Sequence, residues 1–130
     1  MRFLIDTNIL SAFLKGDGKV FGRFMQHTGG LATSTICVGE LYSWAYRAKN
    51  RNRVEPLESL LRDLHVIPVD MDVAARFGSL RAELLDRGHP VPEMDLLIAA
   101  TALLHDLTLV THNVSDFTAI RALRVEDWLA

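Results

Sequence analysis

The sequence has a single cysteine, no apolar run of membrane-spanning length and almost no net charge. Cys37 cannot form an internal disulfide, which is typical of a protein from a reducing compartment. No stretch approaches the roughly 20 apolar residues of a transmembrane helix, and the chain reaches Asp6 too early for a signal peptide. We therefore expect a cytoplasmic protein with no membrane association. No His and Asn pattern accompanies Cys37, so we interpret it as a small buried apolar residue.

The formal net charge of −2 argues by itself against a simple polyanion binder. The sum hides an uneven distribution, because one short segment concentrates basic residues. These are Arg47, Lys49, Arg51 and Arg53. Together with a bound cation, this segment could accept a phosphate backbone. The alternative is a solvated helix end, where cations interact favourably with the helix dipole.

Short apolar runs alternate with helical patterns along the 130 residues. Strands are predicted at 2–5, 31–33, 65–69, 107–110 and 123–125. Helices are predicted at 9–15, 20–27, 36–49, 56–64, 73–87 and 95–105. Such alternation implies parallel strands with right-handed crossovers, and strands that are apolar throughout imply helices on both faces. The sequence thus predicts an α/β fold, a three-layer α/β/α sandwich with a central parallel sheet.

Four acidic residues stand where such a sheet would gather them. They are Asp6, Glu40, Asp95 and Asp116. Ligand sites in parallel sheets form at the carboxyl ends of the strands, and Asp6 and Asp116 each follow a predicted strand. Carboxylates that meet in a partly buried place repel one another and need a counter-ion. A hard divalent cation bound through oxygen atoms, Mg²⁺ or Mn²⁺, is the natural candidate.

Each acidic residue has a simpler explanation when it is taken alone. Asp6 and Asp95 are suitable N-caps, and Asp116 is suited to an Asx turn. Glu40 is harder to explain, because it lies in an apolar stretch with no basic residue at helical contact spacing. The joint pattern favours a shared metal site, since this topology brings all four to one edge of the sheet.

Polar residues flank two of the acids and suit the surroundings of a metal site. They are Thr7, Asn8, Thr111 and Asn113. Hydroxyl and amide groups orient carboxylates or metal-bound water without adding charge. Turn and cap chemistry is the alternative role for these side chains.

Five segments of the chain resemble the PIN-domain family, and specifically the VapC toxin ribonucleases of bacterial toxin–antitoxin pairs. The segments are Phe3–Leu10, Ser34–Leu41, Asp95–Ala102, Leu109–Phe117 and Leu123–Trp128. They occur in the family's order and span nearly the whole chain. The resemblance implies a single PIN domain over residues 1–130, with an acidic metal site formed by Asp6, Glu40, Asp95 and Asp116. It also implies cleavage of RNA and neutralisation by a VapB-like antitoxin, and it makes a homodimer more plausible.

No serine, histidine and aspartate arrangement indicates covalent catalysis, which favours metal-assisted hydrolysis. We expect Asp6 and Asp95 to bind the metal directly. Glu40 and Asp116 are expected to bind it directly, through water, or at a second ion. Attack by water predicts products with a 5′-phosphate and a 3′-hydroxyl. The family leads us to expect structured RNA as substrate, with tRNA ahead of ribosomal RNA.

Four other functions are compatible with parts of the sequence. The segment 16–19 lacks the spacing of a phosphate-binding P-loop. A phosphotransferase that uses Asp6 would want a second acid where Asn8 stands. A DNA nuclease shares the metal chemistry, although the small chain leaves little room to bind a duplex. The alternative from a different class is a non-catalytic partner-binding module with a vestigial acidic site.

Overall fold

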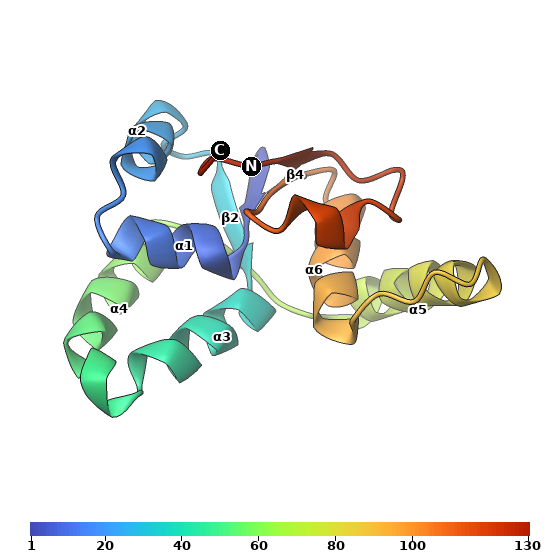
Figure 1. The fold of residues 1–130 in the computed structure, drawn as a ribbon, viewed down its shortest axis with the longest axis horizontal. Helices are drawn as coiled ribbons and strands as arrows, with labels where there is room; N and C mark the ends of the chain where they lie inside the picture. The colour runs from blue at the N-terminus through green and yellow to red at the C-terminus, as the bar shows by residue number, and fades with distance from the viewer.

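The computed structural model describes all 130 residues and contains a five-stranded sheet between two groups of helices (Figure 1). The strands are β1 (Phe3–Ile5), β2 (Leu31–Ser34), β3 (His65–Ile67), β4 (Thr108–Val110) and β5 (Val125–Glu126). The α-helices are α1 (Thr7–Leu14), α2 (Gly18–Gln26), α3 (Thr35–Ala45), α4 (Val54–Arg62), α5 (Met71–Asp86) and α6 (Glu93–Leu104). Two 3₁₀ helices complete the chain, η1 (Ala48–Arg53) and η2 (Val114–Phe117).

All neighbouring strands of the sheet are parallel, in the order β3-β2-β1-β4-β5. The chain builds outward from β1 to β3 on one side and then crosses to β4 on the other. The direction of winding therefore reverses between β1 and β4. In open parallel sheets the crevice beyond the carboxyl ends of such a strand pair is the usual ligand site.

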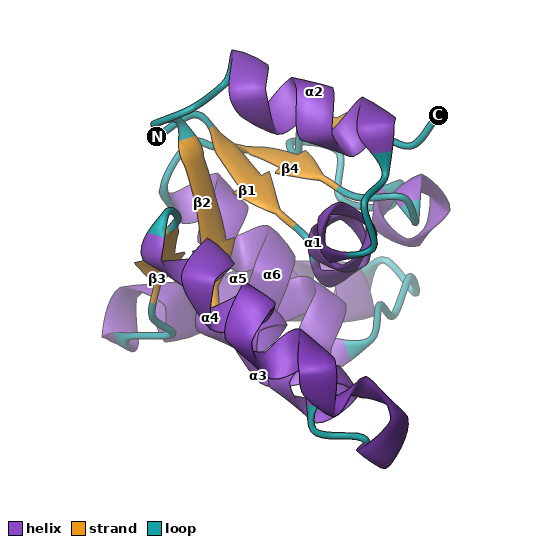
Figure 2. Cartoon of the chain, turned by 90° about the vertical axis from the view of Figure 1, so that its left-hand side faces the viewer, coloured by secondary structure: helices purple, strands orange, loops and turns teal.

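Side chains of the central strand alternate between two cores, one on each face of the sheet. Leu4 packs on the α5 and α6 side, in a cluster that includes Leu84 and Ile98. Phe3 and Ile5 pack on the opposite side, against α1, α2 and α4 (Figure 2). Helices thus cover both faces, and the prediction of a three-layer α/β/α sandwich with a central parallel sheet is confirmed.

Local sequence signals set most of the helix boundaries. Ser34 caps α3 by accepting the Ile36 N–H, and Asp70 caps α5 by accepting that of Val73. Gly88 follows α5 with a φ of +72°, a left-handed conformation that glycine adopts without strain.

The predicted helices begin about two residues too late in most cases, and two boundary errors bear on the site. The third helix ends at Ala45 and not near residue 49, because the backbone of Arg47 is extended and residues 48–53 form η1. The last turn of α3 is closed by side chains from η1: Asn50 donates to the Trp44 carbonyl and Arg51 to that of Tyr46. The last helix begins at Glu93, which places Asp95 inside its first turn.

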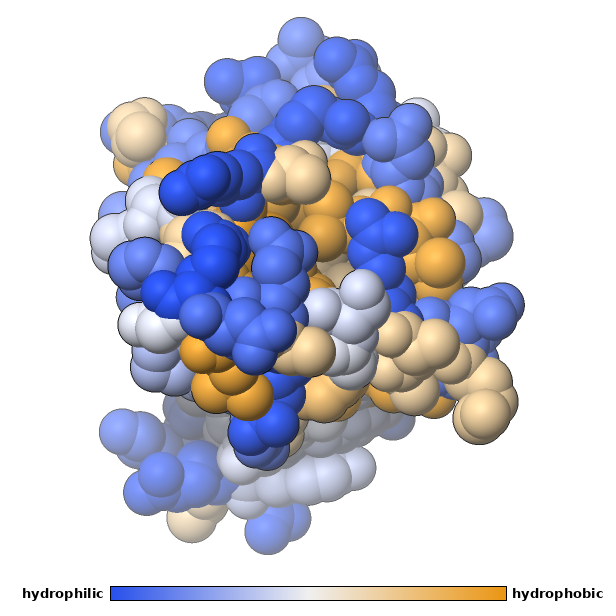
Figure 3. All heavy atoms as spheres, turned by 90° about the vertical axis from the view of Figure 1, so that its right-hand side faces the viewer, coloured by the Kyte–Doolittle hydropathy of each residue, from blue (hydrophilic) through white to orange (hydrophobic).

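None of the helices combines the length and apolar character that a membrane crossing requires. Seen from the side of α5 and η2, hydrophilic side chains cover much of the surface, and apolar side chains show between them (Figure 3).

Trp128 closes the apolar core beside β1, and we expect Trp128→Ala to cost about 3–5 kcal/mol of unfolding free energy. Its side chain is 2% exposed, stacks on His27 and meets the Phe3 ring edge-on. Urea denaturation measures the change. Met71→Ala is the control, because Met71 is 84% exposed and such changes stay within about 0.5 kcal/mol. A loss below about 1 kcal/mol for Trp128→Ala would contradict this packing.

Candidate active site

Asp6 lies at the carboxyl end of β1 and is buried with both carboxylate oxygens hydrogen-bonded. Its backbone N–H donates to the Val110 carbonyl at 2.9 Å, so the pairing of β1 with β4 continues up to this residue. Oδ1 accepts the Thr7 N–H at 2.8 Å, which makes Asp6 the N-cap of α1. Oδ2 accepts the Thr111 hydroxyl at 2.8 Å. Asp6 therefore does cap α1, and Oδ2, which accepts a single hydrogen bond, keeps a further lone pair for a cation.

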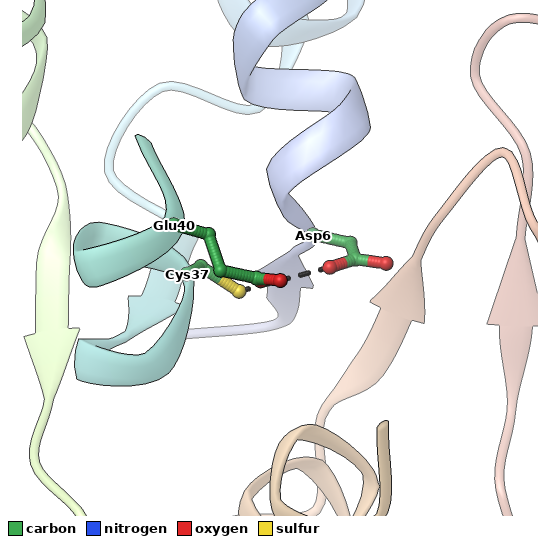
Figure 4. Close-up of side chains that lie close together, drawn as sticks. All are labelled: Asp6, Cys37 and Glu40. Carbon is green, nitrogen blue, oxygen red and sulfur yellow. Dashed lines mark hydrogen bonds between the residues drawn. The ribbon is translucent and has the colours of Figure 1, made fainter. Parts of the chain in front are cut away.

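Glu40 reaches the same place from α3 (Figure 4). Its Oε1 accepts the Thr7 hydroxyl at 2.7 Å, so Thr7 contacts both carboxylates, one through its backbone and one through its side chain. Ligand atoms of Asp6, Cys37 and Glu40 all lie within 4.8 Å of one another. Glu40 itself is exposed, so the carboxylate meets solvent on its far side.

Asp95 lies in the first turn of α6, which packs against α3 and η2. Burial raises the pKa of Asp95, and the charges of Asp6, Asp116 and Glu40 raise it further. Each of the other three carboxylates is therefore close enough to repel Asp95. Asp116, which is exposed in η2, completes the group.

The polar residues beside the acids form a connected network between α1 and β4. Asn8 donates its amide to the Thr111 hydroxyl at 3.3 Å and accepts the His112 N–H at 3.0 Å. The Thr111 hydroxyl also accepts the Asn113 N–H at 3.1 Å. Thr111 thus uses its one proton on Asp6 and both lone pairs on neighbours, which fixes its direction. Asn113 enters this network through its backbone and not through its side chain.

Cys37 belongs to this place, although its sequence context suggested only a buried apolar residue. Its thiol lies 3.7 Å from Asp6 Oδ1 and donates to it. Burial, followed by the charge of Asp6, raises the pKa of Cys37 to about 12. The sulfur therefore stays protonated at neutral pH, as a hydrogen-bond donor and not as a metal ligand. The signal available in the sequence was the three-residue spacing to Glu40, which places both on one helix face.

A histidine–aspartate pair borders the network. His112, directly after Thr111, has its Nδ1 at 3.0 Å from Asp127 Oδ2. Asp127 follows β5, and the pairing of β5 with β4 brings the two together. The sequence contains no spacing pattern that predicts Asp127 as a site residue, because its contact with His112 depends on the pairing of β5 with β4.

The donor set fits a hard divalent cation. Once the protonated thiol is set aside, the available ligand atoms are carboxylate oxygens, which suit Mg²⁺ or Mn²⁺ better than zinc. Burial, followed by the charges of the other acids, disfavours the charged form of Asp95, and a bound cation would offset this cost. The chemistry such a set supports is metal-assisted hydrolysis.

Only three of the four residues in the predicted basic segment line the same pocket. Arg47, Lys49 and Arg53 line one pocket next to Glu40, together with Lys15 from the end of α1. Arg51 does not line it. Its Nε instead donates to the Tyr46 carbonyl at 2.9 Å, a structural role at the end of α3.

Comparisons with known proteins agree with this geometry. The family model described as the PIN domain matches residues 3–123. Ribonuclease VapC2 of Haemophilus influenzae is 34% identical over 99% of both chains. The chain belongs to the VapC group of the PIN-domain family. Another VapC relative, the tRNA(fMet)-specific endonuclease of Shigella flexneri, is 32% identical over 98% of both chains.

Solved VapC structures share the whole fold of this PIN domain. A chain of the DNA-bound VapBC complex from Salmonella typhimurium superposes with a TM-score of 0.91, at 31% identity over 98% of both chains. A chain of VapBC2 from Rickettsia felis, bound to a DNA fragment from its promoter, gives 0.88 at 29% identity. That alignment covers 98% of this chain and 99% of the other.

Thr111→Val should weaken metal binding by about 10–100-fold, because the hydroxyl that orients Asp6 is lost while the side-chain shape is kept. Titration calorimetry with Mn²⁺ measures the affinity, and circular dichroism confirms that the fold persists. Thr101→Val is the matched control, since that buried hydroxyl donates only to Leu97 within α6. Equal affinities in the two variants would refute the orienting role of Thr111.

Asp95→Asn should raise the melting temperature of the metal-free protein at neutral pH. Folding raises the pKa of Asp95, so its charge destabilises the folded state most above that pKa. The advantage of the variant should vanish as the pH falls below about 3.9, where the carboxyl is protonated in both states. With saturating Mg²⁺ the wild type gains stability by binding and the variant gains less.

The control for this experiment is Asp72→Asn, because Asp72 also lies in the first turn of a helix, α5, and is exposed. It should lose a few tenths of a kcal/mol from the helix dipole. Melting curves with and without Mg²⁺ measure both variants. A metal-free Asp95→Asn protein less stable than wild type would show that the four carboxylates do not repel one another.

Proposed function

We propose that this protein is a metal-dependent endoribonuclease and the toxin of a VapBC-type toxin–antitoxin pair. It hydrolyses phosphodiester bonds in structured RNA, with tRNA as the first candidate and ribosomal RNA as the second. One observation carries the proposal: Asp6 at the end of β1 and Glu40 from α3 come together at the switch point of the sheet, where Thr7 donates to both. Burial raises the pKa of Asp95, and the charges of Asp6, Asp116 and Glu40 raise it further, which supports a single group of all four acids. The names of its relatives, a ribonuclease and a tRNA(fMet)-specific endonuclease, support RNA as the substrate.

The acidic residues are proposed to bind a divalent cation, Mg²⁺ or Mn²⁺, in different ways. Asp6 and Asp95 are the proposed direct ligands, because Asp6 is fixed by hydrogen bonds and Asp95 gains most from a nearby positive charge. Glu40 and Asp116 bind directly, through water, or at a second ion. When bound, the cation supplies a Lewis acid and lowers the pKa of an attacking water.

The surrounding polar groups hold the carboxylates in position by hydrogen bonds. Thr7 donates to Glu40, and Thr111 donates to Asp6. Asn8 holds Thr111 and the backbone of His112. Asn113 adds its backbone N–H to Thr111. Such partners preorganise ligands and do not themselves react with the substrate.

The proposed partners are the RNA substrate and a VapB-like antitoxin. Structural neighbours of this chain were solved as VapBC complexes, which supports a VapB-like antitoxin as the partner. A homodimer and a cytoplasmic location remain predictions of the sequence. Arg47, Lys49 and Arg53 are proposed to contact RNA, whereas the carbonyl contact of Arg51 leaves it less available.

Purified antitoxin-free protein should cleave tRNA or total RNA at discrete positions in Mg²⁺ or Mn²⁺ and not in EDTA. Asp6→Asn should lower the rate at least about a hundredfold, because it removes a direct ligand and not merely a supporting group. Gel electrophoresis with end-group analysis measures cleavage, and the products should carry 5′-phosphate and 3′-hydroxyl ends.

The matched control is Asp17→Asn. Asp17 is also an N-cap, of α2, and lies outside the acidic group. Because Asn caps a helix about as well as Asp, both variants should fold, and only Asp6→Asn should lose activity. Products with 2′,3′-cyclic phosphates would rule out attack by water. A protein that neither cleaves RNA nor binds metal would instead be the non-catalytic binding module.

A further inference from the structure

A pocket of about 580 Å³ begins where the acidic group ends. Glu40 belongs to both, and the pocket continues along α3 through Ser43 and Trp44. Residues three and four positions apart share a helix face, so α3 itself joins the two sites. Its volume lies in the range of about 300–1,000 Å³ that small-molecule sites occupy.

Four cations line this pocket and none has a carboxylate partner. They are Lys15, Arg47, Lys49 and Arg53. The salt bridges of the protein all lie elsewhere, and Glu40 bonds to Thr7 and not to a cation. With Glu40 as its one acid, the lining carries a net positive charge, which favours an anion as the ligand.

Trp44 forms part of the pocket wall and lies close to two of these cations. The Lys15 ammonium lies 5.7 Å and the Arg53 guanidinium 5.8 Å from its ring centroid. Arg53 is fixed by donating to the Leu14 carbonyl at 2.7 Å. Asn50 donates to the Trp44 carbonyl at 3.1 Å. The wall of the pocket is thus arranged before any ligand arrives, which lowers the entropic cost of binding.

We propose that this pocket binds the phosphate of the nucleotide next to the bond that is cleaved. The inference rests on the proposed ribonuclease function, because a strand whose phosphate lies at the acids must continue along the surface. The pocket that shares Glu40 is adjacent and carries the complementary charge. Lys15, Arg47 and Lys49 neutralise the phosphate, and the planar Trp44 and Arg53 groups face the attached sugar and base.

Trp44 provides a direct readout, because the chain has two tryptophans and the other, Trp128, is buried in the core. A short single-stranded RNA is titrated into Asp6→Asn protein in EDTA, where no cleavage occurs. We expect a saturable change in tryptophan emission. A second variant that adds Trp44→Phe should lose this change. An emission change that survives Trp44→Phe would overturn the proposal.

Charge is tested with a matched pair of double variants in the same Asp6→Asn background. Lys15→Gln with Lys49→Gln should weaken RNA binding at least about tenfold and reduce the salt slope by roughly 1.4, as expected for two lost phosphate contacts. Lys19→Gln with Arg62→Gln changes the net charge equally at exposed positions outside the pocket. Equal losses of affinity in the two pairs would overturn the proposal.

The outcomes separate this inference from the ribonuclease proposal. Suppose that Trp44 emission responds to RNA but the wild-type protein never cleaves RNA. The pocket would then bind RNA phosphate, and the ribonuclease proposal would be wrong. Metal-dependent cleavage without a Trp44 response would reject the pocket alone. If polyglutamate changes Trp44 emission and RNA does not, the pocket receives an acidic protein partner, and the proposal is wrong.

Discussion

The burial of one carboxylate, that of Asp6, governs the centre of this molecule. A charged group at the end of the middle strand is tolerated only when its oxygens are hydrogen-bonded. Thr7 and Thr111 supply those bonds from two different elements, and the Cys37 thiol adds a weaker one. The hydrogen-bond partners of Asp6 therefore come from distant parts of the chain, from the start of α1 and from the residue after β4.

Two opposite charge zones meet along α3. The acidic zone lies around Asp6, Asp95 and Asp116, and the basic zone around Lys15, Arg47 and Lys49, with Glu40 at the boundary. A net charge near zero conceals this arrangement, because the two zones largely cancel in the sum. A polyanion approaching such a surface is attracted by one zone and repelled by the other unless a cation occupies the acids. Under the proposed function, this field would couple RNA binding to metal binding.

The features that were readable from the sequence depend on short-range order. Strands buried on both faces appear as apolar runs, and the acid that follows each run is then placed by topology alone. That reasoning located Asp6 and Asp116, and the helix patterns added Glu40 and Asp95. Their proximity follows from the fold, while their chemical roles rest on the function proposed above.

Other features depend on contacts that no local pattern encodes. Lys15 meets Trp44, and Asp127 meets His112, only because distant elements pack together. The early end of α3 had a similar cause. Helical propensity continues past Ala45, yet Asn50 and Arg51 bond back to the last carbonyls and turn the chain into η1. Basic residues that looked like one RNA-binding segment were thereby divided between a pocket and a helix end.

The strand order also determines when the site can exist during synthesis. β1 is made about a hundred residues before one of its two neighbours, β4, and Thr111 and Asp116 follow β4. A ribosome adding about 5–20 residues per second therefore exposes Asp6 for several seconds without its partners. Parallel pairing over such sequence distances is slow compared with local helix formation. The four carboxylates therefore cannot meet until Asp116, which follows β4, has been synthesised.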